Sequence, residues 1–158
     1  MNPEQLAAAG SEHAHQRALF AWANMAMEMG YAAAWDMLSY SSKEYASTVV
    51  MPDKSSMKLM TMFAIPNGGE RNKAVAAKLK AEGVKPGVPD IFLPVAVGRW
   101  YGLFVEMKKI GGKASPEQKD WIGALTCNGY RVYLCEGWRM AAESIQYYLE
   151  GHDTYIGS

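Results

Sequence analysis

Two runs of sequence decide the fold of this chain: Gly83-Val84-Lys85-Pro86-Gly87-Val88-Pro89-Asp90-Ile91-Phe92-Leu93 and Tyr101-Gly102-Leu103-Phe104-Val105-Glu106-Met107-Lys108. Both contain the β-branched and aromatic residues that strands favour, so we expect strands over residues 90–97 and 102–108. The turn between them at Gly98-Arg99 is short, and strands joined in this way are antiparallel neighbours. The runs therefore predict a β-hairpin around which the other elements are arranged.

Helical and strand patterns alternate along the rest of the chain. A sequence of 158 residues suits one domain with a hydrophobic core, so we predict a single domain over residues 1–158. Residues 31–57 lack a clear pattern and are expected to hold helical pieces. The order of elements predicts an α/β fold, a mixed β-sheet flanked by helices on both faces. The expected helices are 11–30, 71–82, 115–127 and 139–149, and the further strands are 58–66 and 130–135.

The charges are balanced overall but unevenly distributed. The chain has sixteen Lys and Arg residues and sixteen Asp and Glu residues, and this balance by itself does not indicate a nucleic-acid-binding protein. Five bases lie between residues 71 and 85 against one acid, and three more lie between 108 and 113. A solvated helix face explains any one of these lysines. Two basic clusters on either side of one acidic site also suggest a phosphate-bearing partner.

Neither a membrane span nor an export signal is recognisable in the sequence. No run is apolar enough to cross a bilayer, and the N-terminus lacks a basic segment followed by an apolar one. We therefore expect no membrane association and a cytoplasmic location. The spacing of Cys127 and Cys135 does not fit a metal knuckle, and we expect both cysteines to be reduced.

An acid begins the first predicted strand, and an acid and a lysine lie near the end of the second. Side chains alternate along a strand, so Glu106 and Lys108 point to one face and Met107 to the other. Asp90 enters the neighbouring strand and could lie within reach of Glu106. Two adjacent carboxylates repel each other unless a divalent cation lies between them, and hard oxygen ligands suit Mg²⁺ or Mn²⁺. A surface Glu–Lys pair on an edge strand is the simpler alternative.

Such a cation would serve phosphodiester hydrolysis. It would polarise the phosphoryl oxygen, acidify water and stabilise the leaving oxyanion. Lys108 could orient or deprotonate the attacking water, or neutralise charge on the phosphate. The backbone before Asp90 is fixed by Gly87 and Pro89, and Gly111-Gly112 leaves room for a substrate at the strand end.

These motifs together resemble a known nuclease family. Gly87-Val88-Pro89-Asp90, Glu106-Met107-Lys108, Gly112 and Ser115-Pro116-Glu117-Gln118 resemble the VRR-NUC (virus-type replication-repair nuclease) family of the PD-(D/E)XK nuclease superfamily. Ser11-Glu12-His13-Ala14-His15-Gln16 and Pro66-Asn67-Gly68-Gly69 are also similar to it. The resemblance extends over residues 11–148 except for residues 31–57. It implies a restriction-endonuclease-like core, and the compact chain resembles stand-alone, phage-type members of the family.

The resemblance implies a divalent-metal-dependent nuclease and assigns roles to its residues. Asp90 and Glu106 would bind Mg²⁺ or Mn²⁺ with the main-chain carbonyl of Met107, and Lys108 would be the catalytic lysine. Glu12 would complete the acidic site as a further ligand, and Gln118 would lie at its edge. The DNA contacts are expected from Arg71, Lys73, Lys85, Lys109 and Lys113.

Two of these roles have structural alternatives. Gln118 follows Ser115 by three residues and fits a helix capping box. Glu12 lies in a first helical turn, where acids interact favourably with the helix dipole. Gln16, one turn later, shares the face of Glu12. His13 and His15 are expected to face solvent or DNA rather than a metal.

The leading hypothesis is a homodimeric endonuclease that cuts branched DNA, a Holliday-junction resolvase of a bacterium or phage-infected cell. A dimer would present two active sites for paired cuts. A flap or duplex nuclease of the same chemistry is the second hypothesis. A DNA-binding or assembly protein without catalysis is the third, and a hydrolase of small phosphates fits less well because no glycine loop cradles a phosphate before a helix.

Overall fold

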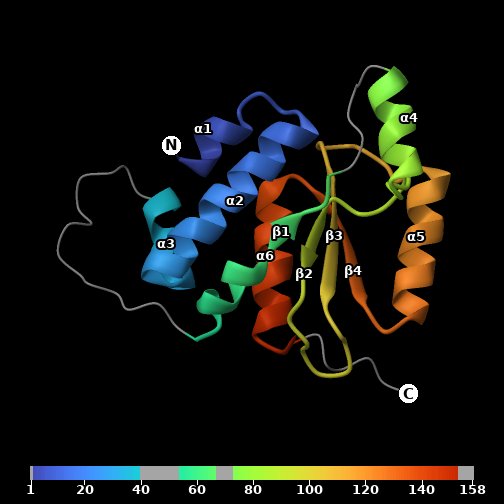
Figure 1. Cartoon of the computed structure of the whole chain (residues 1–158). Coiled ribbons are helices and arrows are strands. Elements are labelled where there is room, and N and C mark those ends of the chain that lie inside the picture. Colours follow the sequence, from blue (N-terminus) through green and yellow to red (C-terminus); the bar gives the residue numbers. More distant parts are fainter. Residues whose placement is uncertain (1, 40–53, 67–72, 153–158) are drawn as a thin grey trace.

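The structure is a computed structural model that describes residues 2–39, 54–66 and 73–152. Figure 1 shows its elements in chain order. The helices are α1 (Pro3–Ala7), α2 (Glu12–Met29), α3 (Tyr31–Ser39), the 3₁₀ helix η1 (Ser56–Thr61), α4 (Lys73–Ala81), α5 (Pro116–Cys127) and α6 (Trp138–Leu149). The strands are β1 (Phe63–Ala64), β2 (Ile91–Leu93), β3 (Leu103–Lys108) and β4 (Arg131–Glu136).

The four strands form one mixed sheet in the order β1-β2-β3-β4. β1 pairs with β2 and β2 with β3 in antiparallel fashion, whereas β3 and β4 are parallel. Ile91 lies opposite Val105, so the chain enters β2 beside the second half of β3. This pairing confirms the predicted hairpin and places Asp90 beside the end of β3.

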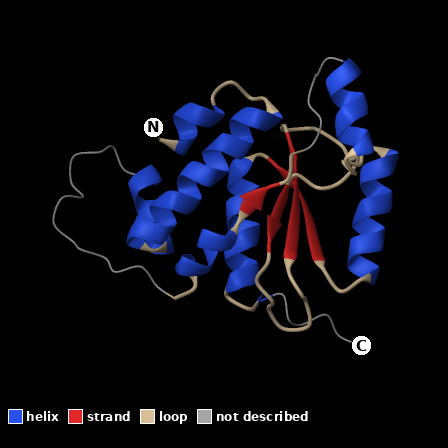
Figure 2. Ribbon diagram, in the orientation of Figure 1, coloured by secondary structure: helices blue, strands red, loops and turns tan. Residues whose placement is uncertain are grey.

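Helices cover both faces of the sheet, as the sequence predicts (Figure 2). α2 and α6 pack against one face and α5 against the other. Leu103, Val105 and Met107 are at most 1% exposed and form the centre of the core below α2 and α6. Cys135 is buried and Cys127 exposed, and both are free thiols, as expected. None of the helices in the described residues is long and apolar enough to cross a membrane.

The predicted strand over residues 58–66 is wrong over most of its length. Residues Ser56–Thr61 form the 3₁₀ helix η1, and only Phe63–Ala64 pair as a strand. Ser56, Leu59 and Met62 are the buried positions. They recur every three residues, which is the period of a 3₁₀ helix and not the alternation of a strand.

The predicted strand over residues 90–97 is shorter than expected. Ladder pairing covers only Ile91–Leu93, because Pro94 has no backbone N–H to donate to a neighbouring strand. Val97 and Trp100 still form an isolated antiparallel bridge across the predicted turn. The segment 31–57 begins as α3, and residues 40–53 within it lie outside the described residues.

The loop that leads to Asp90 is attached to α5. The Trp121 indole Nε1 donates to the Pro86 carbonyl at 3.0 Å. Gly87 has φ of +82°. A Cβ atom there would lie 2.8 Å from the carbonyl carbon of Glu117, so only glycine fits between loop and helix.

Gly87→Ala tests whether this contact positions the loop, with Gly111→Ala as the matched control. Both glycines have positive φ, but a Cβ at Gly111 meets nothing within 4 Å. The control therefore reports backbone strain alone, on the order of 1 kcal/mol. We expect Gly87→Ala to lower the free energy of unfolding in urea by about 3 kcal/mol or more, because main-chain overlap adds to the strain. Equal losses in both variants would contradict the packing role.

Candidate active site

The centre of the site is a buried ion pair on β3. Glu106 is 1% exposed and Lys108 is 5% exposed. The two side chains lie on the same face of the strand, as alternation predicts, and the Lys108 Nζ is 2.7 Å from Glu106 Oε1. The pair therefore lies under the surface, unlike the exposed edge-strand pair that was the simpler alternative.

Asp90 lies beside this pair, immediately before β2. Its Oδ2 accepts a hydrogen bond of 2.8 Å from the Met107 backbone N–H. Its negative charge also acts on Glu106 and raises the pKa of that carboxyl. The structure thus brings together the acid, acid and lysine predicted from the hairpin sequence.

Glu12 reaches the site from the N-terminus of α2. The Ser11 hydroxyl caps this helix by accepting from the Ala14 backbone N–H at 3.1 Å. Glu12 Oε1 lies 3.3 Å from Lys108 Nζ, and its side chain is 48% exposed. Lys108 therefore lies between one buried carboxylate and one half-exposed carboxylate from a distant part of the chain.

Gln118 caps α5 and also lies beside Glu106. With Ser115 it forms a complete capping box: Gln118 N donates to Ser115 Oγ at 3.2 Å, and Ser115 N donates to Gln118 Oε1 at 2.8 Å. Its side-chain Nε2 donates to Glu106 Oε1. The cap thus fixes the amide that contacts the buried carboxylate.

Burial and charge shift the ionisation of the central pair. Burial raises the pKa of Glu106 to about 7, although the hydrogen bond from Lys108 opposes the shift. Burial also acts to lower the pKa of Lys108, but the contacts with Glu106 and Glu12 outweigh it and leave that pKa above its usual value. Lys108 is therefore a cation at neutral pH, whereas Glu106 is balanced between its two forms.

The arrangement fits a divalent cation at Glu106. Its Oε1 is occupied by Lys108 and Gln118, but its Oε2 is buried and has no hydrogen-bond partner. An orphaned carboxylate oxygen in the interior is costly, and a hard cation would satisfy it. Within the described residues, no three His, Cys, Asp or Glu side chains already form a group that could hold a metal. Asp90, Glu106, Glu12 and the Met107 carbonyl therefore stay the predicted ligands.

The predicted DNA contacts are distributed around the site. Lys85, Lys109 and Lys113 are all exposed, on the loops that precede β2 and follow β3. Lys73 begins α4, and Arg71 lies outside the described residues. Lys85, Lys109 and Lys113 are thus free to meet a phosphate backbone.

The structure corrects one expectation for the histidines of α2 and adds one residue. His13 is exposed, but His15 is 8% exposed and packs inside. Glu136, at the end of β4 opposite Lys108, was not foreseen. Its Oε2 accepts from Gly111 N at 2.9 Å and so holds the turn after β3. The sequence indicates this contact with the turn only through the position of Glu136, at the end of a strand and just before Gly137.

The comparisons with known proteins settle the family. A family model of the VRR-NUC domain matches residues 30–138. The chain belongs to the VRR-NUC family. A solved structure named "VRR_NUC domain protein" is similar, with a TM-score of 0.52 and 26% identity, over 78% of this chain and 89% of that chain. No curated protein matches the chain.

Membership of the VRR-NUC family makes the chain a nuclease of the PD-(D/E)XK type that acts on DNA. Asp90, Glu106, Lys108 and Gln118 all lie within the matched segment, whereas Glu12 precedes it. The restriction-endonuclease-like α/β core expected from the sequence is thereby confirmed.

The raised pKa of Glu106 predicts how pH changes stability when a chelator removes metal. Between about pH 4.5 and pH 7 the folded carboxyl holds a proton that the unfolded one has lost. The stabilisation that this proton gives the folded state is complete below pH 4.5 and is lost as pH rises through 7. Relative to Glu106→Gln, the wild-type free energy of unfolding should fall by roughly 3 kcal/mol across this range.

Chemical denaturation at several pH values in excess chelator measures this difference. Glu143→Gln, an exposed acid on α6, is the matched control and should run parallel to wild type. A constant difference between wild type and Glu106→Gln would contradict the burial of an ionisable Glu106.

Proposed function

We propose that this VRR-NUC nuclease is a divalent-metal-dependent endonuclease that cuts branched DNA, as a homodimer acting on four-way junctions. The orphaned Oε2 of Glu106, beside Asp90 and Lys108, carries the proposal for the metal. The resemblance to stand-alone junction resolvases supports the substrate. In a symmetric dimer two such sites would make paired cuts.

The proposed ligands are Asp90, Glu106 and the Met107 carbonyl, with Glu12 at the exposed side. Mg²⁺ or Mn²⁺ there would supply a positive charge that polarises the phosphoryl oxygen and acidifies water. Lys108, held as a cation by Glu106 and Glu12, would neutralise negative charge on the phosphate. Gln118 would keep Glu106 in place by occupying its other oxygen.

Cleavage of a substrate panel tests the proposal. Purified protein with Mg²⁺ or Mn²⁺ should make paired, symmetric cuts in a labelled four-way junction and leave a linear duplex intact. Lys108→Ala should reduce the rate at least a hundredfold, because it removes the charge that meets the phosphate. Lys119→Ala, an exposed lysine on α5, should cut like wild type.

Other outcomes separate the parts of the proposal. Cutting of a flap or a linear duplex would keep the chemistry and exclude the junction role. Undiminished cleavage by Asp90→Ala and Glu106→Ala would show that these carboxylates take no part in the reaction and would exclude the proposed active site. Binding of DNA without cleavage in either metal would indicate a DNA-binding protein.

The exposed lysines around the site should contribute to affinity and not to chemistry. Lys85→Gln, Lys109→Gln and Lys113→Gln should each weaken junction binding. Because each variant releases about one counterion fewer on binding, the slope of the logarithm of the binding constant against the logarithm of salt concentration should fall by about one. Fluorescence anisotropy across a salt series measures both effects. Unchanged salt dependence in all three variants would place the DNA on another face.

A further inference from the structure

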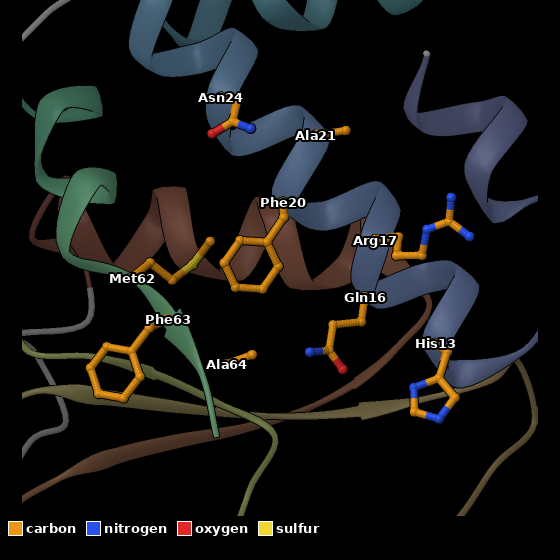
Figure 3. Close-up of a pocket in the computed structure, with 9 residues that line it drawn as sticks. All are labelled: His13, Gln16, Arg17, Phe20, Ala21, Asn24, Met62, Phe63 and Ala64. Atoms are coloured by element: carbon orange, nitrogen blue, oxygen red, sulfur yellow. The ribbon is translucent and has the colours of Figure 1, made fainter. Parts of the chain in front are cut away.

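A large groove lies between α2 and the edge strand β1, outside the acidic site. It has a volume of about 830 Å³. Figure 3 shows Gln16 and Phe20 projecting from α2 toward Met62 and Ala64 on the opposite wall. Phe63 of β1 borders the groove, but its ring projects to the other side of the strand from Ala64 and packs against Phe92.

Both walls of the groove lead to the candidate active site. Gln16 lies one helical turn after Glu12, which contacts Lys108. On the other wall, Ala64 is followed by Ile65, whose N–H donates to the Asp90 carbonyl at 2.7 Å. Each wall of the groove is therefore connected to one of these acids, to Glu12 through about one turn of α2 and to Asp90 through the Ile65 hydrogen bond.

The groove has an apolar, aromatic interior and a polar margin. Phe20 is half-buried and is the aromatic ring that projects into the groove (Figure 3). Gln16 and Asn24 supply amide donors and acceptors, and none of the described residues that line the groove is acidic. Arg17 contributes positive charge at the margin, directed away from Phe20 (Figure 3), and His13 lies beside it on α2.

This combination is suited to a nucleobase. Bases stack on aromatic side chains, their edges hydrogen-bond to amides, and the attached phosphates prefer a margin without carboxylates. A paired base inside a duplex presents only its edge, because its faces are covered by neighbouring pairs. An occupant of the groove must therefore come from a nucleotide that is already unpaired or easily unstacked.

We propose that the groove binds one unpaired nucleobase of the DNA strand, next to the phosphate that is cut. This inference rests on the proposed nuclease function and deepens it. It makes the unpaired base, and not the base sequence, the feature that directs cutting to branch points.

Abasic substitution tests the proposal. A single abasic nucleotide is stepped through every position near the crossover of a labelled junction, and affinity is measured by anisotropy in excess chelator. We expect one position per strand at which loss of the base weakens wild-type binding about tenfold. In Phe20→Leu the same change should weaken binding less than about threefold, because the stacking partner is already absent.

Tyr101→Leu is the matched control. Tyr101 is also an exposed aromatic residue, at 69%, but it lies before β3, at the opposite end of the strand from Lys108. This variant should keep the full abasic effect of wild type. Both leucine variants retain apolar bulk, so circular dichroism should report an unchanged fold.

Two results would overturn the proposal. The first is a flat abasic scan, or an abasic effect of equal size in wild type and Phe20→Leu. The second is a loss of dimers in Phe20→Leu, measured by sedimentation, which would identify the groove as an interface between copies of the chain. Metal-dependent cutting of the intact junction by wild type would leave the nuclease proposal standing in either case.

Discussion

The buried carboxylate of Glu106 is the constraint on which the rest of the site depends. A charge with 1% exposure is costly unless its oxygens are satisfied, and two side chains satisfy one of them. Lys108 comes from the same strand and Gln118 from the first turn of α5, whereas the charge of Asp90, just before β2, repels Glu106 and raises the pKa of that carboxyl. The second oxygen has no partner within the described protein, and this is the position that a cation would fill.

The same contacts connect folding to function. Gln118 closes the capping box of α5 and holds Glu106, so the start of that helix and the geometry of the carboxylate are fixed together. Gly87 lets the loop before Asp90 lie directly on α5. Two of the acidic groups are therefore positioned by one helix.

Much of this site could be predicted from the sequence because its signals are local. Alternation along β3 places Glu106 and Lys108 on one face, and the short hairpin places Asp90 beside them. The contact of Glu12 with Lys108 joins residues 96 positions apart, and only the family resemblance indicated it. The 3₁₀ helix η1 was missed because its apolar residues resemble a strand until burial reveals their period of three. The groove was missed because it forms only when α2 lies against β1.

Calorimetric titration of Mn²⁺ into metal-free protein tests whether the buried carboxylate binds metal. We expect saturable binding to wild type and at least tenfold weaker binding to Glu106→Gln, which keeps the shape of the side chain and removes its charge. Glu143→Gln should bind Mn²⁺ like wild type. Equal affinity of wild type and Glu106→Gln for Mn²⁺ would show that Glu106 is not a metal ligand.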